Sequence, residues 1–350
     1  MGKCQLVADF GNGKVKISAF RKSGGKCELY GGSIFDTPEG GICEPECLRK
    51  FSSALDKIHP AGGDIYILLQ TDEKNVFVTE EDYPADSAKS VNAIIESSLS
   101  GFVTEETEKF TFSWRLIEKY PSGRGRFQIA AARTDFIEEL QDIAEKHKCA
   151  LKRADIVLNA DENLSRLLRK KEKYGLSSNS DTAAIIDVGH KTANVIVFNN
   201  ENTVAAETLG HNLYRMDKII ADVGGDLKND PDIALEMLKL NPSYTSLSAQ
   251  YNGFLEGIAS DIIRTVKHAV GSDRDSKLSA VYFTGGLFKT PGLVSAVKES
   301  FSVSCYAYPI KDFISINEEC INREAKKPYP NAEMFAASLG MLAGGGLFEK

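Results

Sequence analysis

Two segments of the chain place an aspartate and a glycine at the same point of a predicted β-hairpin. One copy reads DFGNGKVKISAF from Asp9, and the other reads DVGHKTANVIVF from Asp187, so that Gly11 aligns with Gly189. Each copy follows an apolar stretch that is expected to form a strand. Chance similarity of two hairpins is the alternative, but the repeated position of both residue types favours an internal duplication.

These residue types suit the binding of a phosphate and its metal ion. Glycine lets main-chain N–H groups approach a phosphate without a Cβ in the way. The first turn offers such donors and one cation at Gly11, Asn12, Gly13 and Lys14. A carboxylate before the turn can hold Mg²⁺ through its water shell. A single hairpin of this kind is more often a plain turn, but two facing hairpins would hold a triphosphate with Asp9 and Asp187 beside the metal.

A third glycine motif follows a predicted buried strand over residues 278–283. Gly285 and Gly286 come directly after that strand and before a helix-forming segment, where backbone can reach a ligand at the sheet edge. A plain β-to-α turn would explain this pair equally well. The sequence contains no GxxxxGK[ST] and no GxGxxG that opens a βαβ unit, which excludes the P-loop and ordinary dinucleotide folds.

The composition is that of a soluble globular protein of two or three compact units. The chain has 350 residues, 42% hydrophobic and 26% charged, and a formal net charge of -7, which argues against non-specific nucleic-acid binding. Seven scattered cysteines do not predict a disulfide framework, and Cys43 and Cys47 have no second pair at zinc-ligand spacing. We expect no signal peptide and no membrane-spanning helix.

Apolar periodicity predicts the elements that must position these motifs. Between the two hairpins it predicts a small α/β insertion, and after the second hairpin it predicts helices and one buried strand. The C-terminal Ala-rich helix is expected to stop at Gly344-Gly345-Gly346. The predicted helices cover residues 84–101, 136–148, 213–223, 254–270 and 332–343, and the predicted strands cover residues 111–117, 127–132 and 278–283.

The order of the two hairpins and the Gly285-Gly286 motif resembles the superfamily of actin, heat-shock chaperones and sugar kinases. Within it the chain is most similar to the PilM family of type IV pilus assembly, and next to the division protein FtsA. The resemblance implies an α/β, actin-like (ribonuclease H-like) fold of duplicated domains with an inserted 1C-type subdomain. The implied first domain covers residues 1–80, 153–178 and 326–350, the insertion 81–152, and the second domain 179–325. Residues 157–168 and 329–344 resemble the two connecting helices.

The resemblance also implies roles for individual residues. Asp9 and Asp187 would position Mg²⁺ through water, and Glu162 would lie near the attacking water. Asp261 and Arg264 match positions that contact ribose and adenine in relatives, although exposed helix charges look the same. The glycine pair would contact the nucleoside. The residues expected to face the phosphates are Gly11, Asn12, Gly13, Lys14, Gly189, His190, Lys191 and Thr192.

The chain departs from the family pattern at two places. His190 and Lys191 stand where relatives have small residues, so this turn is expected either to tighten phosphate binding or to obstruct it. Gly210-His211 stands where relatives often show two glycines.

Three functions fit these features. In the first, ATP with Mg²⁺ holds the two halves closed in a cytoplasmic scaffold of pilus assembly or a related secretion system. That scaffold would dock to the cytoplasmic N-terminal tail of a PilN-like inner-membrane protein, and possible further partners are assembly ATPases. The second is an FtsA-like filament protein, which the chain's short glycine-rich end disfavours. The third is a small-molecule kinase, for which no Asp has a convincing substrate context. We expect ATP binding with slow turnover.

Overall fold

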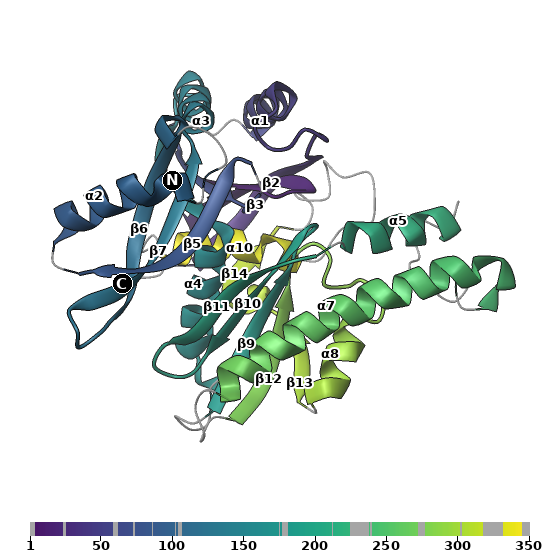
Figure 1. The fold of residues 1–350 in the computed structure, drawn as a ribbon. Coiled ribbons are helices and arrows are strands. Elements are labelled where there is room, and N and C mark those ends of the chain that lie inside the picture. The colour runs from purple at the N-terminus through teal and green to yellow at the C-terminus, as the bar shows by residue number, and fades with distance from the viewer. Residues whose placement is uncertain are drawn as a thin grey trace.

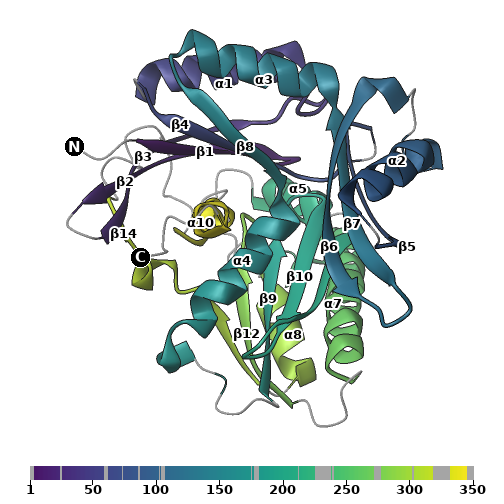
Figure 2. The ribbon, with the colours of Figure 1, turned by 90° about the vertical axis from the view of Figure 1, so that its left-hand side faces the viewer.

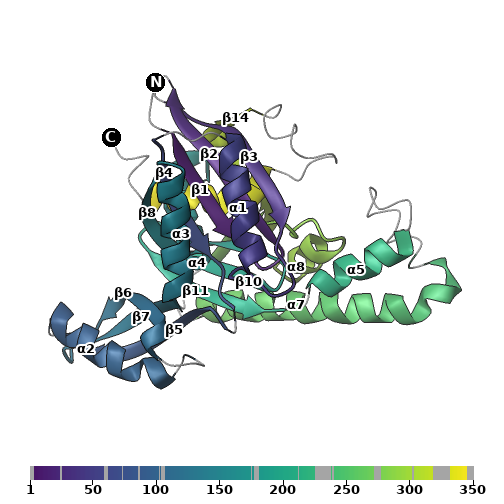
Figure 3. The ribbon, with the colours of Figure 1, turned by 90° about the horizontal axis from the view of Figure 1, so that it is seen from above.

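The computed structural model describes residues 4–23, 26–58, 62–72, 74–85, 87–101, 103, 107–174, 176, 181–211, 213–224, 238, 240–271, 277–301, 303–317 and 332–344. Two large β-sheets face a pair of helices between them, and a third small sheet projects from the side (Figures 1 and 3). No helix in these ranges is both long enough and apolar enough to cross a membrane.

The first sheet has the strand order β14-β3-β2-β1-β4-β8. Strands β1 and β2 form an antiparallel hairpin, and β4 runs parallel to β1 on its other side. Phe10 at the end of β1 packs edge-on against Phe51 of α1 and Phe136 of α3, so these two helices cover one face (Figure 2). The elements are β1 (Gln5–Phe10), β2 (Lys14–Ser23), β3 (Lys26–Asp36), α1 (Pro45–Ile58), β4 (Asp64–Leu69), α3 (Thr134–Lys146), β8 (Ala150–Ile156) and β14 (Ile314–Ile316).

The second sheet repeats this plan with the order β11-β10-β9-β12-β13. Strands β9 and β10 form the hairpin, and β12 runs parallel to β9. Even the register is repeated, because Asp9 pairs with Lys16 and Asp187 pairs with Asn194. The elements are β9 (Asp181–Val188), β10 (Thr192–Phe198), β11 (Thr203–Gly210), α5 (Leu213–Gly224), α7 (Thr245–Gly271), β12 (Lys277–Thr284), α8 (Leu293–Phe301) and β13 (Ser304–Ala307).

Helices α4 (Val157–Arg169) and α10 (Ala336–Gly344) lie between the two sheets and pack closely against each other. Their approach depends on Gly340, because a Cβ there would overlap the main chain of Ala160. The α10 helix is also fixed to the first sheet by a hydrogen bond between Ser338 and Ser18 of β2. These helices therefore connect the two halves in the way the connecting helices were predicted to do.

The small sheet is made of β5 (Val76–Pro84), β6 (Phe110–Lys119) and β7 (Arg124–Arg133), in the order β5-β7-β6. We call it the inserted sheet. Helix α2 (Ala88–Ser98) covers one face, where Val91 and Ile95 bury Phe127 and Ile129. Figure 3 shows that α2 and this sheet project away from the first sheet. The opposite face of the inserted sheet is turned toward β8 and the start of α4.

The predicted elements are present, and most of their ends lie within a few residues of the predicted ones. The helix predicted over 254–270 is longer and begins at Thr245, and the one predicted over 332–343 begins as a 3-10 turn, Ala332–Phe335. Helix α3 packs in the core of the first sheet, so the inserted sheet with its own core spans residues 76–133. The proposed domain limits stay a prediction, and the expected stop after Gly344 lies outside the described residues.

Candidate functional site

The turns of the two hairpins meet between the two halves of the molecule. A Cβ at Gly13 would come 2.5 Å from Cγ of His190, so the first turn touches the ring of the second. Beside this contact, Nε2 of Gln70 donates a 2.7 Å hydrogen bond to Oγ1 of Thr192. The structure thus brings together the two segments that the sequence singled out.

Glycine is required in each turn by the close return of the backbone. A Cβ at Gly11 would lie 2.8 Å from the carbonyl oxygen of Lys14, and a Cβ at Gly189 would lie 3.0 Å from that of Thr192. These distances are shorter than ordinary contacts, so a larger residue would open either turn. Glycine therefore allows both turns to close tightly at equivalent places.

Asp9, the next-to-last residue of β1, is a buried carboxylate paired with a mostly buried cation. Nζ of Lys16 lies 2.5 Å from Oδ2 of Asp9, and the Lys16 side chain is 15% exposed. Burial lowers the pKa of Lys16, but the charges of Asp9 and Asp187 outweigh it and the pKa is raised. Lys16 also donates a hydrogen bond to the carbonyl of Met334. The ammonium group is therefore held charged at the centre of the molecule.

The partly buried Asp187 and the fully buried Asp161 form a second group of acids nearby. Burial raises the pKa of Asp187 to about 6, while Lys16 lowers it and Asp9 raises it. Burial, followed by the charge of Asp187, raises the pKa of Asp161 well above its usual range. Nδ2 of Asn194 donates a 2.7 Å hydrogen bond to Asp161. Because the positive charge of Lys16 faces three carboxyl groups, of which those of Asp9 and Asp161 are buried, the site favours a further cation or a proton.

Gly285 packs directly against the second carboxylate. Its φ of +96° is a left-handed conformation that favours glycine, and a Cβ there would overlap Oδ1 of Asp187. The N–H of Leu287 donates a 3.0 Å hydrogen bond to the carbonyl of Val188. The predicted Gly285-Gly286 motif is therefore adjacent to the second hairpin, as a nucleotide site of this kind requires.

The cationic and polar residues of the two turns contact other groups of the protein. Lys14 forms a 2.7 Å ion pair with Asp36 at the exposed edge, which lowers the pKa of that carboxyl. Asn12 donates to the carbonyl of Thr71. Burial, followed by the charges of Lys191 and Lys14, lowers the pKa of His190. This shift favours the neutral form of His190, whose ring lies against Gly13 of the first turn.

Glu162 is next to Asp161 on α4 but has different neighbours. Its Oε2 lies 2.5 Å from Arg115 of the inserted sheet, and its Oε1 accepts a hydrogen bond from Thr203 at the start of β11. Asp161, in contrast, faces Asn194 and Asp187. The assignment of Glu162 to the attacking water stays a prediction, and the structure shows Asp161 as the acid of α4 that contacts the hairpin carboxylate.

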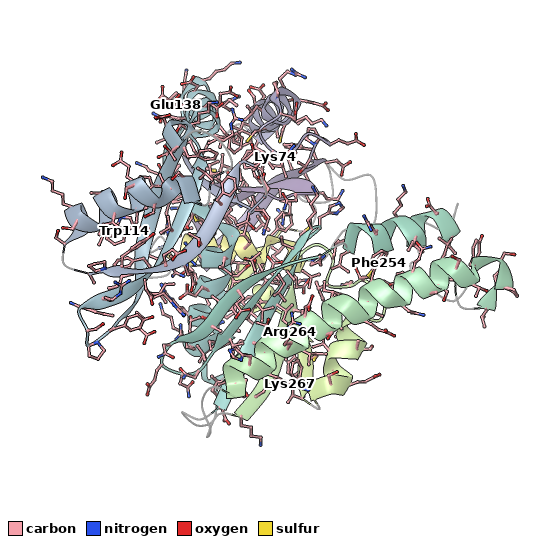
Figure 4. All side chains as sticks on the ribbon, viewed as in Figure 1. Lys74, Trp114, Glu138, Phe254, Arg264 and Lys267 are labelled. Atoms are coloured by element: carbon pink, nitrogen blue, oxygen red, sulfur yellow. The ribbon has the colours of Figure 1, made fainter. Side chains whose placement is uncertain are left out.

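Asp261 and Arg264 pair with each other on α7. Nη2 of Arg264 lies 2.8 Å from Oδ1 of Asp261, and the side chains of Arg264 and Asp261 are 74% and 40% exposed. Figure 4 labels Arg264 on this helix. Their assignment to ribose and adenine stays a prediction.

A second site, which we call the partner groove, lies between the inserted sheet and the first domain. It has a volume of about 420 Å³ and is open to solvent. One side is formed by residues 111–115 of β6, and the other by residues 153–156 of β8 and by Asn159 of α4. Its floor includes the small side chains Ala130 and Ala132 of β7. Small residues on this face leave space that the protein's own side chains do not fill.

Among the described residues, no three carboxylate, histidine or cysteine side chains are arranged to hold a metal ion by themselves.

Comparison with known proteins decides the family. The sequence profile described as type IV pilus assembly protein PilM matches residues 90–342, more than half of the chain. The chain belongs to the PilM family. No curated protein has a significant match to the sequence.

Solved structures confirm the actin-like fold. The structure of a PilM-PilN type IV pilus biogenesis complex matches with a TM-score of 0.68 at 15% identity, over 98% of each chain. A protein of Bacteroides thetaiotaomicron, described as having an actin-like ATPase fold and unknown function, matches with a TM-score of 0.52 at 8% identity. That match covers 88% of this chain and 91% of the other. The predicted family and fold class are therefore confirmed.

Three residues of the central site in this PilM-family chain were not predicted from the sequence. Lys16 and Asn194 follow the two hairpin turns at equivalent positions, opposite Asp9 and Asp187 in the strand registers. The ungapped alignment of the two hairpins contains that signal, because a polar residue in each second strand faces the aspartate across the pair. Asp161 adjoins the predicted Glu162, and helical periodicity alone does not show which of two neighbouring acids faces the site.

Proposed function

We propose that this protein is an ATP-binding scaffold of a type IV pilus or related assembly machine. In this role it docks to the cytoplasmic N-terminal tail of a PilN-like inner-membrane protein. The observation that carries the proposal is the match of residues 90–342 to the PilM family. It is supported by a charged site between duplicated hairpins and by a separate open groove beside the inserted sheet.

The residues between the hairpins fit Mg·ATP. Three carboxyl groups, those of the buried Asp9 and Asp161 and of the partly buried Asp187, face the ammonium of Lys16. A divalent cation beside them would offset the charge of the carboxyl groups that are ionised. Asp9 and Asp187 would hold Mg²⁺ through water, and Mg²⁺ would neutralise phosphate charge. The expected phosphate contacts are main-chain and side-chain groups at Gly11, Asn12, Gly13, Lys14, Gly189, His190, Lys191 and Thr192. Gly285 and Gly286, with Asp261 and Arg264, are proposed on the nucleoside side.

Entry of the phosphates requires the two turns to separate. His190 contacts the position where a side chain of Gly13 would project, so a triphosphate between the turns must displace this ring. We infer that nucleotide binding and a change in the spacing of the two halves are linked. A ligand that binds one arrangement better than the other shifts the population toward that arrangement by its differential affinity.

The partner groove supplies a docking surface for a peptide. Its wall combines apolar side chains such as Leu69, Val76 and Ile137 with a few polar groups. A concave, mostly apolar surface with few convergent polar groups is typical of a binding site. The proposed tail would recruit the protein to the inner face of the plasma membrane. Assembly ATPases are proposed as further partners.

Hydrolysis is proposed to be slow. Catalysis needs a correctly oriented water and base in addition to phosphate contacts. Glu162 is the proposed base near the water, but it is held by Arg115 and Thr203. The scaffold role requires binding only.

Calorimetric titration with Mg·ATP and, separately, with the tail peptide tests the proposal. The peptide is the cytoplasmic N-terminal segment of the PilN-family protein encoded in the same genome. We expect about one nucleotide and one peptide per chain. Ser113→Arg, which fills the partner groove, should abolish peptide binding and leave nucleotide binding intact. Failure of either ligand to bind the unmodified protein would contradict the corresponding half of the proposal.

A further inference from the structure

His211 lies directly beside the second hairpin turn, at one of the two places where the sequence departs from the family pattern. Its main-chain N–H donates a 2.8 Å hydrogen bond to the carbonyl of Lys191 in that turn. Because the strand order is β11-β10-β9-β12, His211 after β11 and Gly285 after β12 lie on opposite sides of the turn that joins β9 to β10. A nucleotide placed across this edge of the sheet would meet both residues.

The hydrogen bonds of the His211 imidazole fix the position of its proton. The N–H of Leu213, the first residue of α5, donates a 3.0 Å hydrogen bond to Nδ1 of His211. Nδ1 must therefore be unprotonated, so the neutral ring carries its hydrogen on Nε2. Burial lowers the pKa of His211 to about 4, with an opposing contribution from the main chain of Thr192 and a further lowering by the charge of His190. The ring is therefore neutral near pH 7 and is a donor at Nε2.

This donor has no acceptor among the residues that the structure describes. Nε2 of His211 is buried and makes no hydrogen bond to them. The carbonyl of Thr192 is near the ring, but it already accepts a 2.9 Å hydrogen bond from the N–H of Gly189 that closes the turn. A buried donor without an acceptor is costly. A ligand oxygen that reached Nε2 would remove this cost.

The charges around the second turn favour an anionic ligand. The positive charges of Lys191 and Lys14 lower the pKa of His190, whereas the carboxylate of Asp36, which is paired with Lys14, acts in the opposite direction. Lys191 is exposed and has no ion-pair partner in the part of the chain that the structure describes. An uncompensated ammonium group beside the turn attracts the oxygens of phosphate groups more strongly than neutral hydroxyl groups.

We propose that Nε2 of His211 donates a hydrogen bond to a phosphate oxygen of the bound nucleotide. This inference rests on the proposed function and adds a binding residue to that site. His190, which contacts Gly13 and would have to be displaced by a triphosphate, also lies near His211. Its displacement would bring phosphate oxygens beside Nε2. The histidine at this position, where relatives often have glycine, therefore contributes to phosphate binding.

Substitution by asparagine separates the donor at Nε2 from the structural role of Nδ1. In His211→Asn the amide oxygen can still accept the N–H of Leu213, because asparagine side chains bond to the main chain two residues on. No donor then reaches the position of Nε2. The variant should bind Mg·ATP at least about tenfold more weakly in calorimetric titration. His268→Asn, the same change at an exposed position in the last turn of α7, should leave the affinity unchanged.

Nitrogen-15 NMR of the histidine rings tests the same contact in the unmodified protein. Saturating Mg·ATP should shift the Nε2 resonance of His211 and leave its Nδ1 resonance nearly unchanged, because Nδ1 stays bonded to Leu213. This measurement needs no folded variant. An Nε2 resonance that does not change when ATP binds would overturn the proposal.

Displacement of fluorescently labelled ATP by Mg·tripolyphosphate identifies the part of the nucleotide that His211 contacts. His211→Asn should lose affinity for tripolyphosphate by about the same factor as for ATP. Weaker ATP binding with an unchanged affinity for tripolyphosphate would place the contact on the nucleoside and overturn the phosphate assignment. ATP binding equal to that of the unmodified protein would overturn the role of His211 and leave the proposed function intact. No ATP binding by the unmodified protein would overturn both.

Discussion

Asp187→Asn is expected to stabilise the protein in the absence of nucleotide while removing its response to Mg·ATP. The carboxyl group of Asp187 has its pKa raised from 3.8 to about 6, chiefly by burial. A group with a raised acid pKa binds more protons in the folded state, so its cost grows as pH rises between these two values. The cost is about 1 kcal/mol at pH 4.5 and approaches about 3 kcal/mol at pH 7.5. Asparagine, which is neutral at every pH, avoids it.

Thermal unfolding at the two pH values measures this difference. The Tm of the Asp187→Asn variant should exceed that of the unmodified protein by several degrees at pH 7.5, and the excess should shrink at pH 4.5. Mg·ATP should raise the Tm of the unmodified protein but not that of the variant, because ligand binding stabilises only the form that binds it. A variant that is less stable than the unmodified protein by the same margin at both pH values would contradict the assigned cost of this carboxylate.

Three further changes test other parts of the site. Gly340→Ala should lower the free energy of unfolding in urea by about 1–3 kcal/mol, because the added Cβ would overlap the main chain of α4. The loss is expected although alanine favours helices. Equal or greater stability would show that the helices can separate freely. His190→Ser should speed Mg·ATP association in stopped-flow fluorescence, because the ring blocks the approach to Gly13, and an unchanged rate would show that the ring is no obstacle. Glu162→Gln should weaken tail-peptide binding several-fold through loss of the Arg115 ion pair, whereas a selective loss of phosphate release would assign Glu162 to the attacking water instead.

Helix α4 has two acidic residues that face the two sites. Asp161 contacts the carboxylate of the second hairpin, and the adjacent Glu162 pairs with Arg115 at the partner groove. Arg115 in turn donates to Gln128 on the groove floor. Neighbouring residues of one helix therefore contribute to both sites.

The sequence was sufficient for features that depend on local pattern. The duplicated hairpins, the glycine pair after β12 and the connecting helices have strong periodicity or required glycines, as Gly285 with its positive φ illustrates. Side-chain partners across the halves were not predictable. The contact of His190 with Gly13 and the choice of Asp161 over Glu162 as the neighbour of Asp187 depend on how the sheets and α4 are placed in space. The packing of α3 in the first core, and not with the insertion that precedes it, also follows from tertiary contacts.

Nucleotide binding between the hairpins is tested most directly by calorimetric titration of the purified protein with Mg·ATP, with released phosphate assayed in the same sample. We expect binding near one site per chain with little phosphate released, and loss of that binding in Asp187→Ala. Absence of binding by the unmodified protein would mean that the turn containing His190 and Lys191 no longer admits phosphates. The actin-like fold would then serve as a scaffold without nucleotide, and the proposed role of ATP in this protein would be contradicted.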